Sequence, residues 1–276
     1  VVGIPIVAIA GIFILYAFLG PWIPGRLGHR GADFETLVGH LFFTTEGIFG
    51  IPLGVSSTFI FLFILFGAYL EKTGLGQYFI DLSNALAGRS MGGPAKVAVL
   101  SSGLMGMVSG SSVANVVGTG SFTIPMMKKL GYKPEFAGAV EATASTGGQL
   151  MPPIMGAAAF LMAEFTEIPY ARIIGAAVIP ALLYYFGVWA GVHLEAKRLG
   201  LRGMTKEELP KLKDLWQKAY LVIPLGAIVW LLVTGYTPMR AALVAIVLSI
   251  ATALLASGAN LLLKRPVEFK PVDIVK

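Results

Sequence analysis

The sequence predicts an all-α protein that crosses the membrane several times. Hydrophobic residues make up 56% of its 276 residues and charged residues only 13%, about half of the roughly 25% typical of soluble proteins. Several apolar runs reach the ~20 residues that span a bilayer as a helix. Two other apolar passages are interrupted by small and polar residues, at 109–112 (the first break) and 145–149 (the second break). Irregular backbone survives at membrane depth only inside protein or beside water, so these breaks are the features to explain.

Charge and cysteine content exclude several kinds of site. The net charge is +6, but the basic residues lie in loops beside apolar segments, which is the positive-inside pattern of membrane proteins. We therefore expect a lipid bilayer and no nucleic acid as a partner. The absence of cysteine excludes disulfides and thiolate chemistry. The basic loops are expected on the cytoplasmic side.

Residues 1–92 are expected to form a scaffold of spans and surface helices. Val1–Gly20 and Ile51–Leu70 are apolar and long enough to cross a bilayer. Phe34–Phe49 mixes apolar residues with acidic residues and a histidine, which suits an interfacial helix. Leu75–Leu86 is short and amphipathic, and we expect it along the membrane surface.

Residues 93–165 are predicted to form a helical hairpin followed by a broken helix. A single helix over Gly93–Met127 would run about 50 Å, which is too long for one crossing of a roughly 30 Å hydrocarbon core and too short for two crossings with a loop. A re-entrant hairpin with its tip around Gly110–Asn115 fits that length. One unbroken span over the same residues is the alternative.

Pro134–Phe165 is predicted as one crossing in two halves. The first half, Glu135–Thr146, begins just after a proline, and the second is expected to begin at Pro152 and Pro153, where a helix tolerates proline. The linker Thr146–Met151 would lie near the centre of the bilayer.

Residues 166–276 are expected to add further spans. Ala171–His193, Ala219–Thr234 and Met239–Leu263 are apolar, and Leu194–Lys218 is a basic connector between them. These segments complete the predicted all-α polytopic fold.

Oxygen-bearing side chains gather at both breaks. The first offers Ser109, Ser111, Ser112, Asn115 and Thr119, and the second offers Ser145, Thr146 and the backbone of Gly147 and Gly148. Glycine permits positive φ, which would turn carbonyls inward. A sodium ion can bind such oxygens, and half-helix N-termini suit a carboxylate. Small residues also serve ordinary helix packing in membranes, and that is the alternative interpretation.

Glu141 is an acid within the first half of the broken helix. An ionisable residue inside a span is a functional candidate, although this one could instead face a cytoplasmic water cavity. A membrane enzyme using Glu141 or His193 is a further alternative, but no second acid, base or metal ligand lies at matching depth.

One family shares both motifs. The stretches GLMGMVSGSSVANVVGTGSFTIPMM and GYKPEFAGAVEATASTGGQLMPPIMGAAAFLMAE resemble the large membrane (permease) subunit of TRAP transporters, the tripartite ATP-independent periplasmic transporters. These two stretches are most similar to the TAXI branch, in which the small and large membrane subunits are often fused. The resemblance covers about Gly92 to Glu164. It implies the elevator fold of the ion transporter superfamily, with two inverted repeats that each contain a re-entrant hairpin and a broken helix.

The resemblance also implies a function. Such a protein would be a sodium-coupled permease of the bacterial inner membrane that imports organic acids, often dicarboxylates. A periplasmic substrate-binding protein would deliver the substrate, a small membrane subunit would be a further partner, and sodium would be the coupling ion. The resemblance implies that the first sodium site is lined by Ser109, Ser111, Asn115, Gly147 and Gly148. It implies that the substrate is bordered by Gly110, Ser112, Thr146 and Pro152.

The family pattern is only half present. No second hairpin and broken helix follow Leu263, so we expect this chain to be the first repeat, with its flanks, of a longer protein. Two alternative functions stay open. One is a sodium–dicarboxylate symporter of the same superfamily that needs no binding protein, and the other is a membrane subunit that does not transport.

Overall fold

The computed structural model describes residues 3–205, 207 and 209–262, and its regular elements in that part are all helical. Five helices among the described residues are long and apolar enough to cross a membrane: Ile4–Trp22, Ile51–Lys72, Tyr170–Arg198, Leu215–Val233 and Pro238–Ala256. This finding supports an all-helical protein with several spans. The predicted first and last spans also include Val1, Val2 and Leu263, which lie outside the described residues.

The chain divides into two compact units, and the first ends at Val55. Its described elements are α1 (Ile4–Leu19), η1 (Gly20–Trp22), η2 (Gly25–Leu27), α2 (Phe34–Phe43) and α3 (Ile51–Val55). The loop after α1 folds back onto that helix, since the Tyr16 hydroxyl donates to the Leu27 carbonyl at 2.6 Å. Asp33 caps α2 by accepting the backbone N–H of Thr36 at 3.5 Å, and hydrogen bonding by Thr36 lowers the pKa of its carboxyl.

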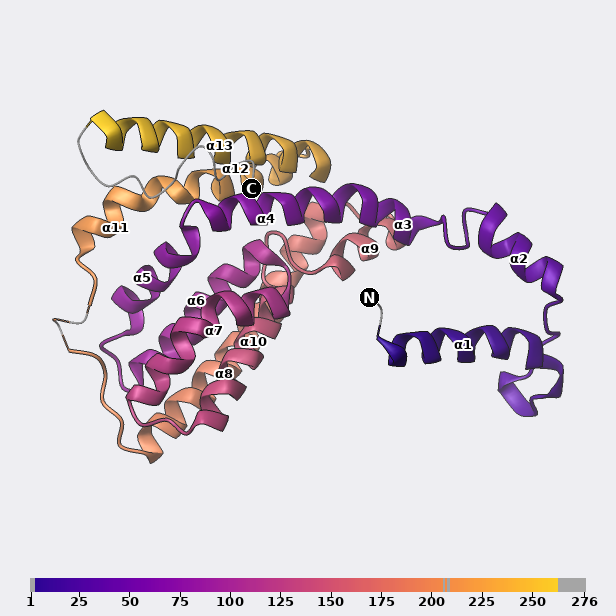
Figure 1. Cartoon of the computed structure of the whole chain (residues 1–276), viewed down its shortest axis with the longest axis horizontal. Coiled ribbons are helices and arrows are strands. Elements are labelled where there is room, and N and C mark those ends of the chain that lie inside the picture. Colours follow the sequence, from indigo (N-terminus) through magenta and orange to yellow (C-terminus); the bar gives the residue numbers. More distant parts are fainter. Residues whose placement is uncertain (1–2, 206, 208, 263–276) are drawn as a thin grey trace. The chain divides into compact units, whose positions relative to one another are not determined.

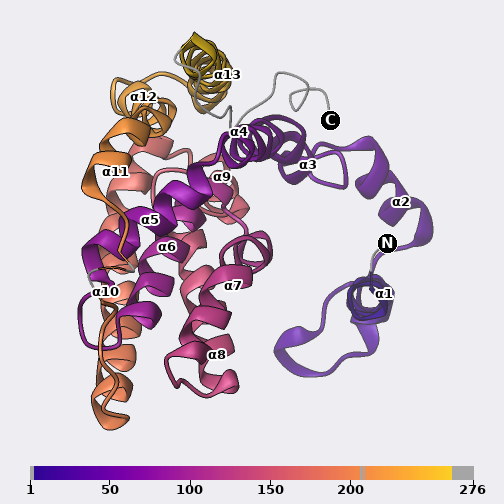
Figure 2. The ribbon, with the colours of Figure 1, turned by 60° about the vertical axis from the view of Figure 1, so that its left-hand side comes forward.

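The second unit begins at Ser56 and contains the helices that carry both breaks. Its described elements are η3 (Ser56–Ile60), α4 (Phe61–Lys72), α5 (Leu75–Ala87), α6 (Gly93–Ser109), α7 (Ser112–Lys129), α8 (Pro134–Gly147), η4 (Gly148–Leu150), α9 (Ala157–Thr166), α10 (Tyr170–Arg198), α11 (Leu212–Lys218), η6 (Ala219–Val222), α12 (Ile223–Val233) and α13 (Pro238–Leu262). Figure 1 and Figure 2 show α6, α7 and α8 side by side. Helix α5 packs against α6, and α10 packs against α6 and α8. Helix α13 packs against α4 and α12.

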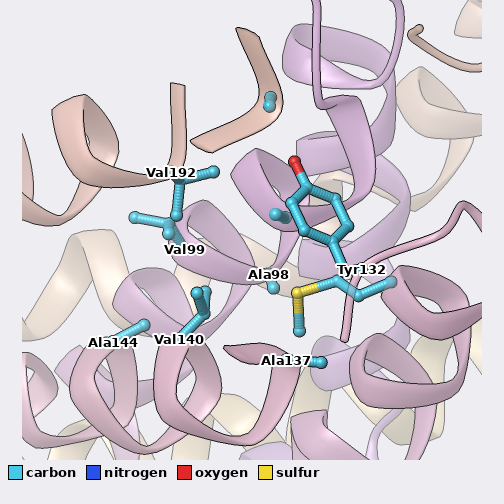
Figure 3. Close-up of a cluster of buried hydrophobic side chains, with 10 residues drawn as sticks. Ala98, Val99, Tyr132, Ala137, Val140, Ala144 and Val192 are labelled. Atoms are coloured by element: carbon cyan, nitrogen blue, oxygen red, sulfur yellow. The ribbon is translucent and has the colours of Figure 1, made fainter. Parts of the chain in front are cut away.

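Mostly small side chains from α6, α8 and α10, together with Met127 of α7 and Tyr132, form a core cluster (Figure 3). The buried residues are Ala95, Ala98, Val99, Met127, Tyr132, Ala137, Val140, Ala144, Val192 and Ala196. Because alanine lets helix backbones approach closely, α8 can lie tightly against its neighbours. Tyr132 comes from the turn between α7 and α8, where burial, and less strongly the negative charge of Glu195, raises the pKa of its phenol to about 12.

The predicted break in Gly93–Met127 is confirmed. Helix α6 ends at Ser109, Gly110 adopts φ +61°, and α7 begins directly after Ser111. The turn is tighter than the predicted tip, because Ser111 caps α7 by accepting the N–H of Ala114 at 3.3 Å. The two arms contain 17 and 18 residues and run about 25–27 Å, which is shorter than a roughly 30 Å hydrocarbon core.

The second half of the broken helix begins later than expected. We expected it to begin at Pro152, whereas α9 begins at Ala157. The Tyr170 hydroxyl, from α10, donates to two carbonyls of the loop, and the N–H of Gly156 donates to the carbonyl of Gln149 at 2.9 Å. These bonds hold residues 148–156, called the linker below, outside a continuous helix. The predicted linker Thr146–Met151 was therefore too short.

The glycines of the second break serve close packing. The φ angles of Gly147 and Gly148 are −59° and −58°, so neither residue uses the positive φ that glycine permits. A Cβ on Gly148 would lie 2.5 Å from the Cα of Gly106, and a Cβ on Gly147 would lie 2.5 Å from the ring of Tyr184. Glycine is required there because α6 and α10 come so near.

We predict that Gly106→Ala destabilises the protein. The added Cβ would lie 2.4 Å from the Cα of Gly148, a backbone atom, so α6 or the linker would have to shift. Overpacking of this kind costs about 1–3 kcal/mol, which should appear as a lower thermal midpoint of the purified protein. The matched control is Gly138→Ala in α8, where a Cβ meets nothing within 4 Å and alanine should be neutral or stabilising by up to about 1 kcal/mol. Equal midpoints for the two variants would refute the close contact.

Candidate functional site

The two breaks meet inside the second unit. A Cβ on Gly110, at the hairpin tip, would overlap the carbonyl oxygen of Met155 in the linker. Beside it, the Gln149 side-chain amide donates to the hydroxyl of Ser112 at 3.1 Å. The hairpin tip and the linker are therefore joined by a backbone contact and by a side-chain hydrogen bond.

A cavity of about 1040 Å³ opens at this junction. The hairpin contributes Ser109, Gly110 and Ser111 to its wall, and α10 contributes Arg172. Gln149 lines it from the linker, while most of the remaining wall is apolar. A largely apolar pocket with a few placed polar groups is typical of a binding site for a small organic molecule. Such pockets have volumes of roughly 300–1,000 Å³.

Asn115 is the most informative of the residues predicted to bind sodium. It is buried in the first turn of α7, and its Nδ2 donates to the carbonyl of Ser102 at 2.7 Å. Its Oδ1 is also buried but has no hydrogen-bond partner. Leaving such an acceptor unpaired costs about 1–3 kcal/mol. A bound cation would supply the missing partner.

The structure brings part of the predicted sodium set together. A Cβ on Gly106 would overlap the Cα of Gly148 and would lie 3.2 Å from Nδ2 of Asn115. Gly148 and Asn115 therefore both lie next to Gly106. Ser109 and Ser111 lie at the tip, where the Ser111 N–H donates to the Ser109 hydroxyl at 3.4 Å. Gly147, by contrast, ends α8 against the ring of Tyr184.

The residues predicted beside substrate are more scattered. Gly110 lines the cavity, whereas Ser112, Thr146 and Pro152 are absent from its wall. The Thr146 side chain is exposed, and its hydroxyl donates to the Ala142 carbonyl of its own helix at 2.8 Å. Of these four residues, Gly110 at the hairpin tip is the one that lines the cavity.

Glu141 is fully buried where α8 meets both arms of the hairpin. Its Oε1 accepts hydrogen bonds from the hydroxyls of Ser102 at 2.6 Å, Thr119 at 2.5 Å and Ser145 at 3.2 Å. Its Oε2 accepts one from Thr123 at 2.5 Å. These hydroxyls satisfy a buried carboxyl that would otherwise be costly.

Sequence reasoning missed several residues of the site. Gln149 belongs to the second break but was not assigned a role, and Gly106 gave no signal beyond its small size. Arg172 comes from a separate helix, so nothing local indicates that it lines the cavity. The hydroxyls around Glu141 carried a weak signal, because Thr119 and Thr123 are four residues apart and share one face of α7.

Comparison with known proteins finds permease proteins of TRAP transporters among the relatives. The sequence is similar to two proteins named C4-dicarboxylate TRAP transporter large permease protein DctM. The one from Pseudomonas aeruginosa is 34% identical over 70% of this chain and 45% of its own length, and the one from Vibrio cholerae is 30% identical over 90% and 52%. The isethionate TRAP transporter permease protein DctMQ of Oleidesulfovibrio alaskensis is 24% identical over 80% of this chain and 35% of its own length.

The chain spans about half the length of these two DctM relatives. The family model described as tripartite ATP-independent periplasmic transporter, DctM component, matches residues 1–270. With a match over almost the whole sequence, a helical fold and several candidate spans, the chain belongs to the DctM component family of the tripartite ATP-independent periplasmic transporters.

Proposed function

We propose that this chain is part of a sodium-coupled permease that imports organic acids. The observation that carries the proposal is the buried, unpaired Oδ1 of Asn115 beside the contact between the two breaks. Family membership supports transport, and the two DctM relatives are named for C4-dicarboxylates. The substrate, the coupling ion and the partners given below are proposals for the whole protein.

The proposed sodium site is centred on Oδ1 of Asn115, which has no hydrogen-bond partner. It comprises Ser109, Ser111, Asn115, Gly147 and Gly148. Helices α6 and α8 both end beside this point, where the last carbonyls of a helix need partners from outside it. The Gly148 carbonyl already accepts the N–H of Met151 at 3.1 Å. Side-chain and carbonyl oxygens of this kind bind sodium in broken-helix transporters.

The proposed substrate site is the cavity next to the tip. The first N–H groups of α7 carry partial positive charge, and Ser111, which caps that helix, lines the cavity. Arg172 adds a guanidinium to the wall, and guanidinium groups suit carboxylates. Gly110, Ser112, Thr146 and Pro152 are proposed to border the substrate. Of these four residues, Gly110 lines the cavity in this structure and the other three do not.

Sodium would favour the anion through charge. A cation held by Asn115 places a positive charge close to the hairpin tip, and in a partly buried site such an attraction is worth a few kcal/mol. Substrate would then bind more tightly once sodium is present. This link between the two ligands is the physical basis of the proposed symport.

The proposed wider arrangement follows the family resemblance. The short arms of the hairpin support a re-entrant position, in which α6 and α7 enter and leave the bilayer on one side. The hairpin and the broken helix would form half of the moving part of an elevator transporter of the TAXI type. A periplasmic substrate-binding protein and a small membrane subunit, separate or fused, are the proposed partners in the bacterial inner membrane.

We predict that Asn115→Ala and Ser111→Ala weaken sodium binding. Each removes an oxygen of the proposed site, and a loss of about 1–3 kcal/mol raises the sodium concentration for half-maximal effect by roughly 5- to 150-fold. The measurement is sodium-dependent thermal stabilisation of the purified protein, with uptake assayed in proteoliposomes.

Ser121→Ala is the matched control for these variants. Ser121 is exposed on α7, and its hydroxyl donates to the Gly118 carbonyl of the same helix at 3.0 Å. Unchanged sodium dependence in both site variants would count against the sodium site. Stability that ignores sodium even in the wild type would favour the non-transporting subunit.

We predict that uptake requires the binding protein. Proteoliposomes containing the complete permease should accumulate a labelled dicarboxylate under a sodium gradient when the soluble binding protein is added, and should show only background uptake without it. The control is the same vesicle with potassium replacing sodium. Full uptake without any soluble partner would instead identify the binding-protein-independent symporter.

A further inference from the structure

The cavity beside the hairpin tip is larger and more apolar than a C4-dicarboxylate needs. Its volume of about 1040 Å³ is at the upper end of the range for pockets that enclose drug-sized ligands, roughly 300–1,000 Å³. A C4-dicarboxylate is far smaller than such a ligand. Most of the wall is apolar and comes from η3, α4, the linker, α9 and α10. The chemistry of this wall indicates which kind of organic acid fits it.

Buried aromatic rings hold one part of the wall in place. The ring of Phe160 in α9 stacks on the ring of Tyr170 in α10, with 4.7 Å between their centroids, and its centroid lies 4.8 Å from that of Phe63 in α4. Phe63 and Phe160 are both buried and both line the cavity. The Tyr170 hydroxyl also donates to two carbonyls of the linker. These contacts join three helices to the linker and fix the apolar wall.

Other apolar side chains of the wall are left uncovered. Ile64 of α4 is 61% exposed, Met162 of α9 is 52% exposed and Leu150 of η4 is 43% exposed. Removing apolar surface from water is favourable, so a ligand whose own apolar body covers these side chains gains affinity. A C4-dicarboxylate is charged at both ends and offers little apolar surface.

The wall provides for one negative charge. Among the described residues that line the cavity, Arg172 is the only charged one. Its side chain is exposed, and no ion pair to it is found in the described part of the chain. Ser109, Ser111 and Gln149 add polar side chains without charge. A guanidinium binds one carboxylate through parallel N–H groups, and a second carboxylate would lie against apolar side chains without a partner, which is costly.

Helix α10 places the charge and the apolar surface in a row. Arg172, Ala176 and Pro180 line the cavity at intervals of four residues, with Ile173 and Ala177 beside them. Residues four apart share a helix face, and Pro180 lies about 12 Å further along the helix than Arg172. The guanidinium therefore belongs to the first turn of α10, and apolar residues follow it. A ligand with an anionic group at one end and an apolar body matches this order.

We propose that the cavity prefers a monocarboxylate with an apolar body to a C4-dicarboxylate. The carboxylate pairs with Arg172, and the chain or ring of the acid covers the apolar wall. The preference rests on the proposed function, because it concerns the proposed substrate site.

Equilibrium binding to the complete permease in lipid nanodiscs tests the preference. The probes are succinate, which is a C4-dicarboxylate, and the series butyrate, pentanoate and hexanoate, each added together with sodium. The dissociation constant should fall with every added methylene, by up to about fourfold per step, and hexanoate should bind more tightly than succinate. An affinity that does not rise along the series, or succinate binding more tightly than hexanoate, overturns the proposal.

Ala177→Phe tests where the apolar body lies. A phenyl ring at this residue of the wall would occupy space inside the cavity, so the gain in affinity along the series should be lost. The matched control is Val178→Phe at the next residue of α10, which is exposed and lies outside the wall, and it should keep the gain. An Ala177→Phe variant with the wild-type series overturns the placement.

Arg172→Gln keeps the proposal testable if the phenylalanine variant does not fold. Loss of the hydrogen bonds to a charged group should raise the hexanoate dissociation constant by about tenfold or more. Arg172→Lys should recover part of the affinity, because lysine keeps the charge but lacks the planar fork. Partition of hexanoate into the bilayer would survive both substitutions. Unchanged hexanoate binding in Arg172→Gln therefore overturns the pairing.

An anionic phospholipid has the same chemistry, since it joins a charged head to apolar chains. Analysis of the lipid that remains bound after purification separates the two sources. A site made for lipid would retain phosphatidylglycerol in the wild type and not in Arg172→Gln, and hexanoate would not displace it. That result overturns the assignment to a soluble acid, whereas displacement by hexanoate supports it.

The same titrations distinguish this preference from the proposed function itself. If succinate binds in the presence of sodium and hexanoate does not, the substrate site stands and the preference fails. If neither acid binds, the substrate site fails. If hexanoate binds equally well with and without sodium, the preference stands and the proposed coupling to sodium fails.

Discussion

The backbone contact between Gly106 and Gly148 is the constraint on which the rest of the site depends. A side chain on either residue would push α6 and the linker apart. This one contact brings the first break to the second, seats the tip against Met155 and leaves Asn115 buried beside the junction. Without it, the two breaks would lie apart, and the proposed sodium and substrate sites would not lie side by side.

The polar groups on the two sides of this contact differ in whether they have hydrogen-bond partners within the protein. Toward the cavity, the tip presents Ser109, Gly110 and Ser111, and α10 adds the guanidinium of Arg172, which suits a carboxylate. Away from the cavity, Glu141 is surrounded by hydroxyls that satisfy it completely. Asn115 is hydrogen-bonded to Ser102 and Thr119, whose hydroxyls both donate to Glu141.

The sequence predicted what depends on local pattern. Apolar lengths indicated the spans, and the SGSS cluster indicated the hairpin turn, because glycine and a serine cap act within a few residues. The sequence did not predict the features that depend on contacts between residues far apart in the chain. The loop before α9 is held by the Tyr170 hydroxyl, and Gly148 is needed because Gly106 of α6 packs against it. The partners of Glu141 and the place of Arg172 at the cavity likewise arise from packing between helices.

Cross-linking measures the meeting of the two breaks most directly. The chain has no cysteine, so Ser112→Cys with Gln149→Cys introduces the only thiols, at side chains joined by a 3.1 Å hydrogen bond. The account predicts that a short bifunctional thiol reagent links this pair in native membranes, but does not link Ser121→Cys with Gln149→Cys, since Ser121 lies about 13 Å further along α7. Equal linking of both pairs, or no linking of the first, would contradict it.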